Sequence, residues 1–176
     1  KGIYIQATSL GAGFASLEEI RDALKDFKES GKFIVAYGDT YTQNLYYLSS
    51  VADKVLLNPQ GMLEWRGLAA TPMFFKDLLE KVGVEMQVFK VGTYKSAVEQ
   101  FISTAMSAAN REQINVYLSY IWGQITSPVA ESPTISDKAL KQEADRRMMF
   151  NPATERVTNG LVTHLQKKNI VSAHLK

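Results

Sequence analysis

Short apolar runs alternate with amphipathic segments along the first half of the chain, and this alternation restricts the possible folds more than any other feature. The run at 33–37 ends at Gly38, and the run at 55–57 is followed by Asn58 and Pro59. Runs of this kind are typical of strands buried in a parallel sheet. Because the segments between them carry apolar residues at helical spacing, the pattern predicts an α/β domain with mostly parallel strands and right-handed crossovers.

The same criteria predict elements along the whole chain. Ser16 and Glu19 form a capping-box pattern, which predicts that the first helix begins at Ser16, and Gly31 is expected to end it. Two Ser-Pro pairs, at 127–128 and 132–133, predict a break between helices. Strands are predicted at 2–7, 33–37, 55–57, 63–70 and 84–91, and helices at 16–31, 41–52, 72–82, 110–125, 135–149, 151–160 and over the last dozen residues. We interpret residues 1–176 as a single, partial domain whose helix-rich part begins at about 108.

The composition excludes several classes of function. A chain of 176 residues with 45% hydrophobic residues can form a core, and its net charge of +2 is spread without a basic block, so nucleic acid is not an expected partner. Cysteine is absent, and the two histidines, His164 and His174, lie near the C-terminus. A cysteine nucleophile, a histidine metal cluster and a Ser-His-Asp triad are therefore not expected, and no cofactor is predicted.

The sequence shows neither a membrane span nor a leader. No run approaches the roughly 18 to 20 apolar residues that a spanning helix needs, and no signal-peptide pattern is present. The chain begins at Lys1 within a strand pattern and without an initiator Met. We interpret it as a piece of a longer protein, with any membrane anchor lying upstream.

One lysine occupies a position that suits a reactive group. The segment VEMQVFKV at 84–91 alternates apolar and polar residues and predicts a strand, and Lys95 follows shortly after Gly92. A lysine that acts as a base needs a lowered pKa, for which an apolar wall of Tyr94, Val91 and Val98 is expected. Glu99 would oppose this role if a helix placed it one turn from Lys95. The alternative interpretation is that Lys95 is an ordinary solvated lysine.

Three segments resemble, in the same order, those of the signal peptide peptidase A family, also called protease IV: GDTYTQNLYYL at 38–48, VLLNPQG at 55–61 and GTYKSAVE at 92–99. The family consists of bacterial membrane-anchored serine proteases, and the resemblance covers most of residues 1–125. It implies the spiral of ββα units shared by Clp-type proteases and crotonases, with extra C-terminal helices. It also implies a Ser-Lys dyad that degrades cleaved signal peptides in the cell envelope, outside the cytoplasm.

The resemblance assigns this chain to the first of two related halves. Lys95 is then the general base, and Gln43 stands where the second half carries its serine, with Asn44 and Leu45 in place of glycines. The nucleophile is therefore expected outside residues 1–176, and the isolated chain is expected to be inactive. The implied partners are apolar signal peptides, the missing C-terminal half, further copies of the chain, and a membrane reached only through the upstream anchor.

Alternative functions and local roles stay open. A non-catalytic assembly domain of the same fold explains the absence of a nucleophile equally well, whereas a crotonase-like acyl-thioester enzyme needs glycine-rich turns that 38–45 lacks. Ser96 competes as a nucleophile, but a helix N-cap or a hydrogen bond beside the lysine is preferred, and Thr93 could cap similarly. Core or subunit contacts are expected for the aromatic pairs, and solvated surface for two charged pairs: Tyr46-Tyr47 and Phe74-Phe75, and Asp53-Lys54 and Arg146-Arg147.

Overall fold

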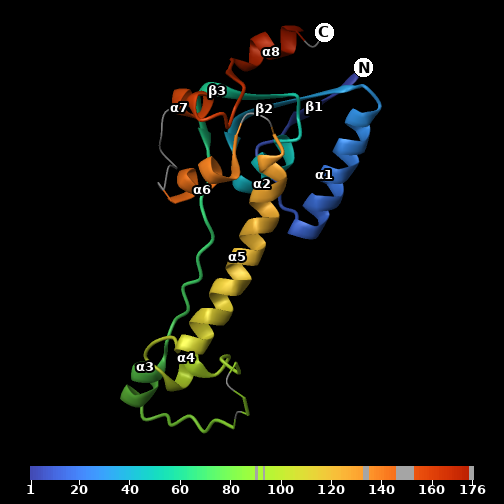
Figure 1. Ribbon diagram of the computed structural model, residues 1–176. Helices are drawn as coiled ribbons and strands as arrows, with labels where there is room; N and C mark the ends of the chain where they lie inside the picture. The colour runs from blue at the N-terminus through green and yellow to red at the C-terminus, as the bar shows by residue number, and fades with distance from the viewer. Residues whose placement is uncertain (90, 93, 133–134, 146–152, 175–176) are drawn as a thin grey trace. The chain divides into compact units, whose positions relative to one another are not determined.

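The computed structural model describes residues 1–89, 91–92, 94–132, 135–145 and 153–174. The chain divides into two compact units, which are described separately. One consists of Lys1–Gly67 together with Gln124–Lys176, and the other of Leu68–Gly123. Figure 1 shows their elements in chain order: β1 Gly2–Gln6, α1 Phe14–Glu29, β2 Phe33–Tyr41, α2 Gln43–Ser49, β3 Lys54–Leu63, α3 Lys76–Lys81, α4 Glu99–Ile102, α5 Ala108–Ala130, α6 Asp137–Asp145, α7 Ala153–Thr158, β4 His164–Leu165 and α8 Lys168–His174.

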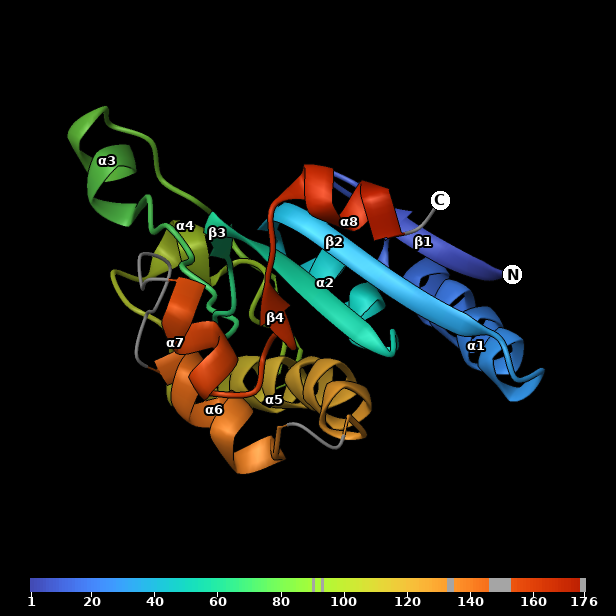
Figure 2. The same ribbon diagram turned by 90° about the horizontal axis from the view of Figure 1, so that it is seen from above.

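The first unit is built on a four-stranded parallel sheet in the order β1-β2-β3-β4. Its register pairs Ile3 with Ile34, Ala36 with Val55, and Leu56 with His164. Figure 2 shows α8 on one side of this sheet and α1 on the other. Helices on both sides of a parallel sheet are the arrangement of an α/β fold, so the fold class predicted from the sequence is confirmed.

Alternation along the strands sorts the side chains onto two faces. On one face Tyr37 and Leu56 are buried against Val171 of α8. Ile34 and Leu57 point to the opposite face and are fully buried. The core is therefore continuous across the sheet, although α8 is a short helix.

Aromatic residues extend this core between the sheet and the C-terminal helices. The ring of Tyr46 lies edge to face with those of Tyr41 and Trp65, at centroid distances of 6.2 and 5.4 Å. The Tyr46 hydroxyl donates to the Leu161 carbonyl at 2.7 Å, and Trp65 donates its indole N–H to the Leu140 carbonyl at 3.0 Å. Tyr46 and Tyr47 are thus core residues, as expected from the sequence.

Several predicted boundaries in the first unit are wrong. Helix α1 begins at Phe14 with Gly13 as its N-cap, so Ser16 and Glu19 lie inside the helix and form no capping box. Strand β3 continues to Leu63, past Pro59, and no strand follows at 64–70. Strand β4 has only two residues, which is too short for a periodic pattern to reveal.

Helix α5 also differs from the prediction because it runs through Pro128 to Ala130. A proline removes one backbone N–H from a helix and crowds the carbonyl four residues earlier. Here the helix ends two residues after Pro128, so little of it lies beyond the disruption. The break predicted from the two Ser-Pro pairs is therefore present, because α5 ends at Ala130 between them, although the helix continues through the first pair.

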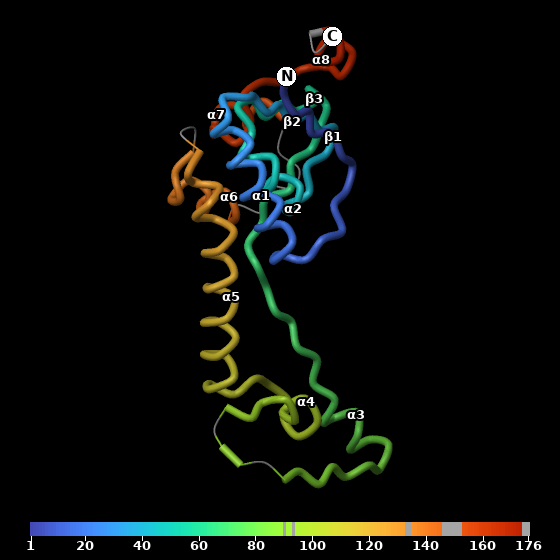
Figure 3. Tube along the Cα trace, turned by 90° about the vertical axis from the view of Figure 1, so that its right-hand side faces the viewer, coloured from blue at the N-terminus to red at the C-terminus, as the bar shows by residue number. Residues whose placement is uncertain are grey.

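The second unit contains α3, α4 and the first part of α5, and its described residues include no strand. Helices α3 and α4 lie side by side (Figure 3). The Phe75 backbone N–H donates to the Gln100 carbonyl at 2.6 Å, and the Phe75 ring stacks on that of Phe101 at a centroid distance of 6.1 Å. The core or subunit contact expected for Phe75 is therefore a contact within this unit.

The strand predicted at 84–91 is absent from the described residues 84–89 and 91. Phe89 and Val91 are 96% and 91% exposed, so the alternating apolar residues do not form a buried face within this unit. Alternation indicates which residues could share a face, but a strand also needs a neighbour to pair with its backbone. Lys90, the penultimate residue of the predicted strand, lies outside the described residues.

Candidate functional site

Lys95 lies on an exposed stretch between a turn at Tyr94 and helix α4, instead of at a strand end. The predicted apolar wall is also wrong for two of its members, because Val91 is exposed and Tyr94 is 54% exposed. The Tyr94 hydroxyl donates to the Glu112 carboxylate of α5 at 3.3 Å. Within this unit, Lys95 therefore has a solvent-facing position, and Thr93 beside it lies outside the described residues.

Glu99, the residue expected to interfere with a basic lysine, is only 4% exposed and faces the first turn of α5. Its carboxylate accepts from the Ser107 hydroxyl at 2.6 Å, the Ser107 backbone N–H at 3.2 Å and the Asn110 side-chain amide at 3.0 Å. Helix α4 begins at Glu99, so Lys95 does not lie one helical turn before it. The helical pair considered from the sequence is therefore not formed.

Ser96 does not cap α4 with its side chain. The N-cap residue is Val98, which makes no side-chain cap, and the Ser96 backbone carbonyl accepts from the Glu99 N–H at 3.0 Å. The N-cap role expected for Ser96 is thus wrong.

The turn between β2 and α2, in the first unit, has the form expected for a nucleophile position. Strand β2 ends at Tyr41, Thr42 caps α2 by accepting from the Leu45 N–H at 3.4 Å, and Gln43 is the first helical residue. A strand-to-helix turn exposes a side chain at a helix N-terminus, where a serine hydroxyl could attack. Here the Gln43 side-chain oxygen accepts from the Arg66 backbone N–H at 3.0 Å. The side chain thus makes a structural contact, and an amide is no nucleophile.

The two motifs at 38–48 and 55–61 meet next to this turn, because they lie on the adjacent strands β2 and β3. Asp39 accepts from the Tyr37 hydroxyl at 2.8 Å and from the Asn58 side-chain amide at 2.6 Å. The hydrogen bond from Asn58, followed by that from Tyr37, lowers the pKa of the Asp39 carboxyl. Burial, with the Asp39 hydrogen bond second, raises the pKa of Tyr37 to about 12.

Gly61 is required by this close approach. A β-carbon there would lie 2.6 Å from the Asp39 carbonyl oxygen and 2.9 Å from that of Asn58. Backbone atoms cannot yield as a flexible side chain does, so a larger residue would displace the loop. The cluster of Asp39, Asn58 and Gly61 therefore fixes the end of β2, from which the turn to Gln43 begins.

The part of the chain that the structure describes contains no group of three or more His, Cys, Asp or Glu side chains placed to hold a metal ion. No helix within that same part is long and apolar enough to cross a bilayer.

Comparison with known proteins identifies the family to which the chain belongs. A sequence profile named peptidase family S49 matches residues 26–176. The chain belongs to peptidase family S49. The resemblance to signal peptide peptidase A and protease IV is thereby confirmed at the level of the family. A solved structure, the 1510-N membrane-bound stomatin-specific protease S97A mutant, matches 97% of this chain and 67% of its own with a TM-score of 0.52. At 11% identity this likeness concerns the fold alone, which is that of Clp-type proteases and crotonases.

Relatives of this S49 chain are much longer than the part they share with it. Protease 4 of Salmonella typhi is 42% identical over 130 residues, which are 74% of this chain and 21% of that protein. Protease 4 of Haemophilus influenzae is 39% identical over 134 residues, 76% of this chain and 22% of that protein. An Enterococcus faecium protein whose name includes the words signal peptide peptidase SppA is 24% identical over 94% of this chain and 47% of its own length. The chain therefore spans about a fifth of the length of the Protease 4 relatives.

Some side-chain contacts in the first unit were not predicted from the sequence. Asp53 and Lys54 are exposed, as expected, but the sequence did not predict that Asp53 accepts from the Ile34 N–H at 2.8 Å and pairs with Lys28 at 3.0 Å. Burial acts to raise the pKa of Asp53, but these partners outweigh it and lower the pKa. The Asp39–Asn58 contact was missed because it depends on the pairing of two strands. Arg146 and Arg147 lie outside the described residues.

Proposed function

We propose that this chain is the lysine-donating part of an S49 serine endopeptidase, with Lys95 as the general base and the nucleophilic serine outside residues 1–176. One observation supports placing the lysine and the serine in different parts of the protease. The turn from β2 to α2 is built as a strand-to-helix turn, but it presents Gln43, whose side-chain oxygen is held by the Arg66 backbone. The serine must then come from another part of the protease.

In the proposed reaction, the serine Oγ attacks the scissile carbonyl and the Lys95 amine takes the hydroxyl proton. The tetrahedral intermediate collapses, and the same amine gives the proton to the departing amine of the substrate. Water then repeats the sequence on the acyl-enzyme. Backbone N–H groups that stabilise the oxyanion are proposed to lie with the serine, since the turn at 38–45 has Asn44 and Leu45 in place of glycines.

A lysine base must be neutral, and an ordinary lysine with a pKa of about 10.4 is protonated at pH 7. Burial or a neighbouring cation provides the necessary change. Because Lys95 is exposed in its own unit, we propose that the serine-bearing half covers it in the complete protease. A neutral Lys95 is also compatible with the contacts of Glu99, because this carboxylate accepts hydrogen bonds from Ser107 and Asn110 at the start of α5.

The proposed substrates are apolar signal peptides after their release, in accord with the name of the Enterococcus relative. We place the complete protease at the bacterial cell envelope, outside the cytoplasm, with an anchor upstream of Lys1.

Self-association is also proposed, because the second unit exposes large apolar side chains: Phe89, Val91, Val116, Tyr117 and Tyr120. Light scattering across a concentration series checks this, and a monomer at every concentration would contradict it.

The exposure of Lys95 favours one competing function, a non-catalytic assembly domain. Substituting Lys95→Ala in the full-length protein separates the two. For the protease, turnover of an apolar peptide should fall by at least about a hundredfold, the usual minimum for loss of a positioned base. The free energy of unfolding should change by less than about 0.5 kcal/mol, as for most surface substitutions.

Lys81→Ala is the matched control, because Lys81 is an exposed lysine at the end of α3 in the same unit. It should keep full turnover. If Lys95→Ala also keeps full turnover, the assembly domain replaces the proposal.

A further inference from the structure

One face of the sheet is only partly covered. Alternation places Phe33, Val35 and Tyr37 on this face of β2, and α8 covers its far end, where Val171 packs on Tyr37 and Leu56. Phe33, at the near end, is 49% exposed. Parallel sheets are normally covered on both faces, so this uncovered end is unusual.

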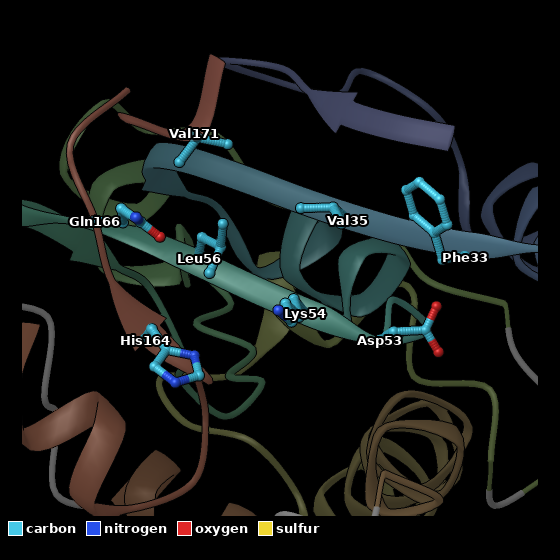
Figure 4. A pocket seen from close by; sticks show the side chains of 8 residues that line it. All are labelled: Phe33, Val35, Asp53, Lys54, Leu56, His164, Gln166 and Val171. Carbon is cyan, nitrogen blue, oxygen red and sulfur yellow. The ribbon is translucent and has the colours of Figure 1, made fainter. Parts of the chain in front are cut away.

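A pocket of about 570 Å³ occupies the uncovered end (Figure 4). This volume is within the range of roughly 300 to 1,000 Å³ that is typical of small-ligand sites. Its lining comes from β2, β3, β4 and α8 and from residues next to these elements: Phe33, Val35, Asp53, Lys54, Leu56, His164, Gln166 and Val171. Half of these side chains are apolar, and they come from β2, β3 and α8.

The acidic and the basic side chain at the pocket differ in whether they already have partners. The Asp53 carboxylate is already engaged by the Ile34 N–H and by Lys28. Lys54 is exposed, and it makes no ion pair with an acidic side chain in the described part of the chain. His164 is paired in register with Leu56, two residues beyond Lys54 on the same face, so the ammonium and the imidazole belong to one side of the sheet. An unpaired cation and an N–H donor thus adjoin an apolar floor.

We propose that this pocket binds an apolar chain that ends in a carboxylate. The apolar part would be buried against Phe33, Val35 and Leu56, which removes apolar surface from water on both sides. The carboxylate would accept charge-assisted hydrogen bonds from Lys54 and His164. A fatty acid and the C-terminal residues of an apolar peptide share this chemistry. The proposal is independent of catalysis by Lys95, since it concerns binding in the other unit.

Calorimetric titration of the 176-residue chain with matched acids and amides tests the proposal. Decanoate, below its micelle concentration, and an apolar tetrapeptide with a free C-terminus are compared with decanamide and the C-terminally amidated peptide. At least one acid should bind saturably with one site per chain, and its amide at least tenfold more weakly. The acid that binds more tightly identifies the source of the ligand.

Variants locate the site. Lys54→Met should weaken binding of the acid at least tenfold and leave the weak binding of the amide unchanged. Lys141→Met is the matched control, since Lys141 is an exposed lysine of α6 paired with Asp137 at 2.7 Å, and it should bind like the unmodified chain. Phe33→Ser should weaken the acid and the amide alike, while circular dichroism shows an unchanged fold.

Three results would overturn the proposal: no saturable binding of either acid, equal affinities for acid and amide, or an unchanged affinity in Lys54→Met. In the first case, sedimentation that shows a dimer dissociated by Phe33→Ser would mean that a second copy of the chain covers this face instead.

Discussion

Glu99 shows how a single carboxylate organises the segment that carries Lys95. It is buried at the start of α4, and three donors from Ser107 and Asn110 converge on it from the first turn of α5. Negative charge at a helix N-terminus is favourable, and the buried donors need an acceptor. From the sequence, Glu99 was expected to oppose a basic role of Lys95. In the structure its hydrogen bonds instead hold the start of α4 against the start of α5.

We expect Glu99→Ala to lower the free energy of unfolding by about 1–3 kcal/mol, because it leaves buried donors without their acceptor. Urea unfolding measures the loss, and hydrogen exchange should locate it in the amides of Ser107 and Asn110. Glu80→Ala, which removes an exposed carboxylate paired with Lys76 at 3.6 Å, should change stability by less than about 1 kcal/mol. Equal losses in the two variants would mean that the hydrogen bonds of Glu99 contribute nothing specific.

Asp39 gives a prediction about pH. The Asn58 amide, and after it the Tyr37 hydroxyl, lowers the pKa of Asp39 from its ordinary value of 3.8. A lowered folded-state pKa contributes stability above the ordinary pKa, and this contribution disappears as the pH falls through the lowered value. Asn58→Ala should raise the Asp39 pKa toward 3.8, as measured by carboxyl NMR titration. Gln60→Ala is the control, because Gln60 donates to Asn58 through its backbone N–H, which the substitution keeps, and the Asp39 titration in this variant should match that of the unmodified chain.

Among the elements, Arg21 of α1 joins three helices. Its guanidinium donates to the Tyr47 carbonyl of α2, to the Ser50 hydroxyl at 2.8 Å, and to the Pro128 carbonyl of α5 at 2.6 Å. Burial lowers the pKa of this group, although it stays a cation at any ordinary pH. The Pro128 carbonyl is close to the end of α5, where carbonyls have no partner inside the helix. Arg21 therefore supplies a donor where the helix itself provides none.

Replacing this buried arginine by methionine keeps much of the side-chain volume but leaves the acceptors unsatisfied. Arg21→Met should lower the free energy of unfolding by about 2–4 kcal/mol, as expected for lost hydrogen bonds to a charged group. Arg66→Met is the matched control, since Arg66 is 68% exposed and pairs with Glu64 at the surface. It should cost less than about 1 kcal/mol. Thermal unfolding of both variants gives the comparison, and similar midpoints would contradict the buried role of Arg21.

The sequence predicted those elements whose pattern arises from burial within one unit. The strands at 2–6 and 33–41, and the helix at 14–29, lie close to their predicted positions because a parallel sheet needs continuous apolar runs and crossover helices. The strand at 84–91 failed because its alternation had no partner strand in the described residues. The N-cap predicted at Ser16 was wrong, whereas Gly31 follows the end of α1 with a φ of 75°, as its predicted role as a helix stop requires.

The candidate site was predictable only in part, for a similar reason. Lys95 and Gln43 were identified from short segments that resemble a family, and such segments need no knowledge of the fold. The contact of Glu99 with Ser107 depends on the connection between α4 and α5, and that of Asp39 with Asn58 depends on the pairing of β2 with β3, so residues 8 and 19 positions apart reach hydrogen-bonding distance. No local pattern specifies those distances.

At the scale of the whole molecule, Lys95 and Gln43 belong to different compact units of a chain that spans about a fifth of its Protease 4 relatives. The second unit has few elements of its own and exposes side chains such as Phe89. Exposed apolar side chains are consistent with a surface that another part of the protease covers. These observations agree with the proposal that the catalytic centre forms only when another part of the protease is present.

The isolated 176-residue chain should accordingly hydrolyse no peptide, although it carries the proposed base. A Ser-Lys pair needs its two groups within roughly 2.6–3.2 Å, and Gln43 cannot replace the serine. Without the oxyanion donors, most of the stabilisation of the transition state is absent as well. Labelling with a serine-reactive fluorophosphonate, together with an apolar peptide assay, should give a signal for the full-length protein and none for the isolated chain. If the isolated chain is labelled and the label maps to its own Ser96, the nucleophile lies beside Lys95 and the division into two catalytic halves is wrong.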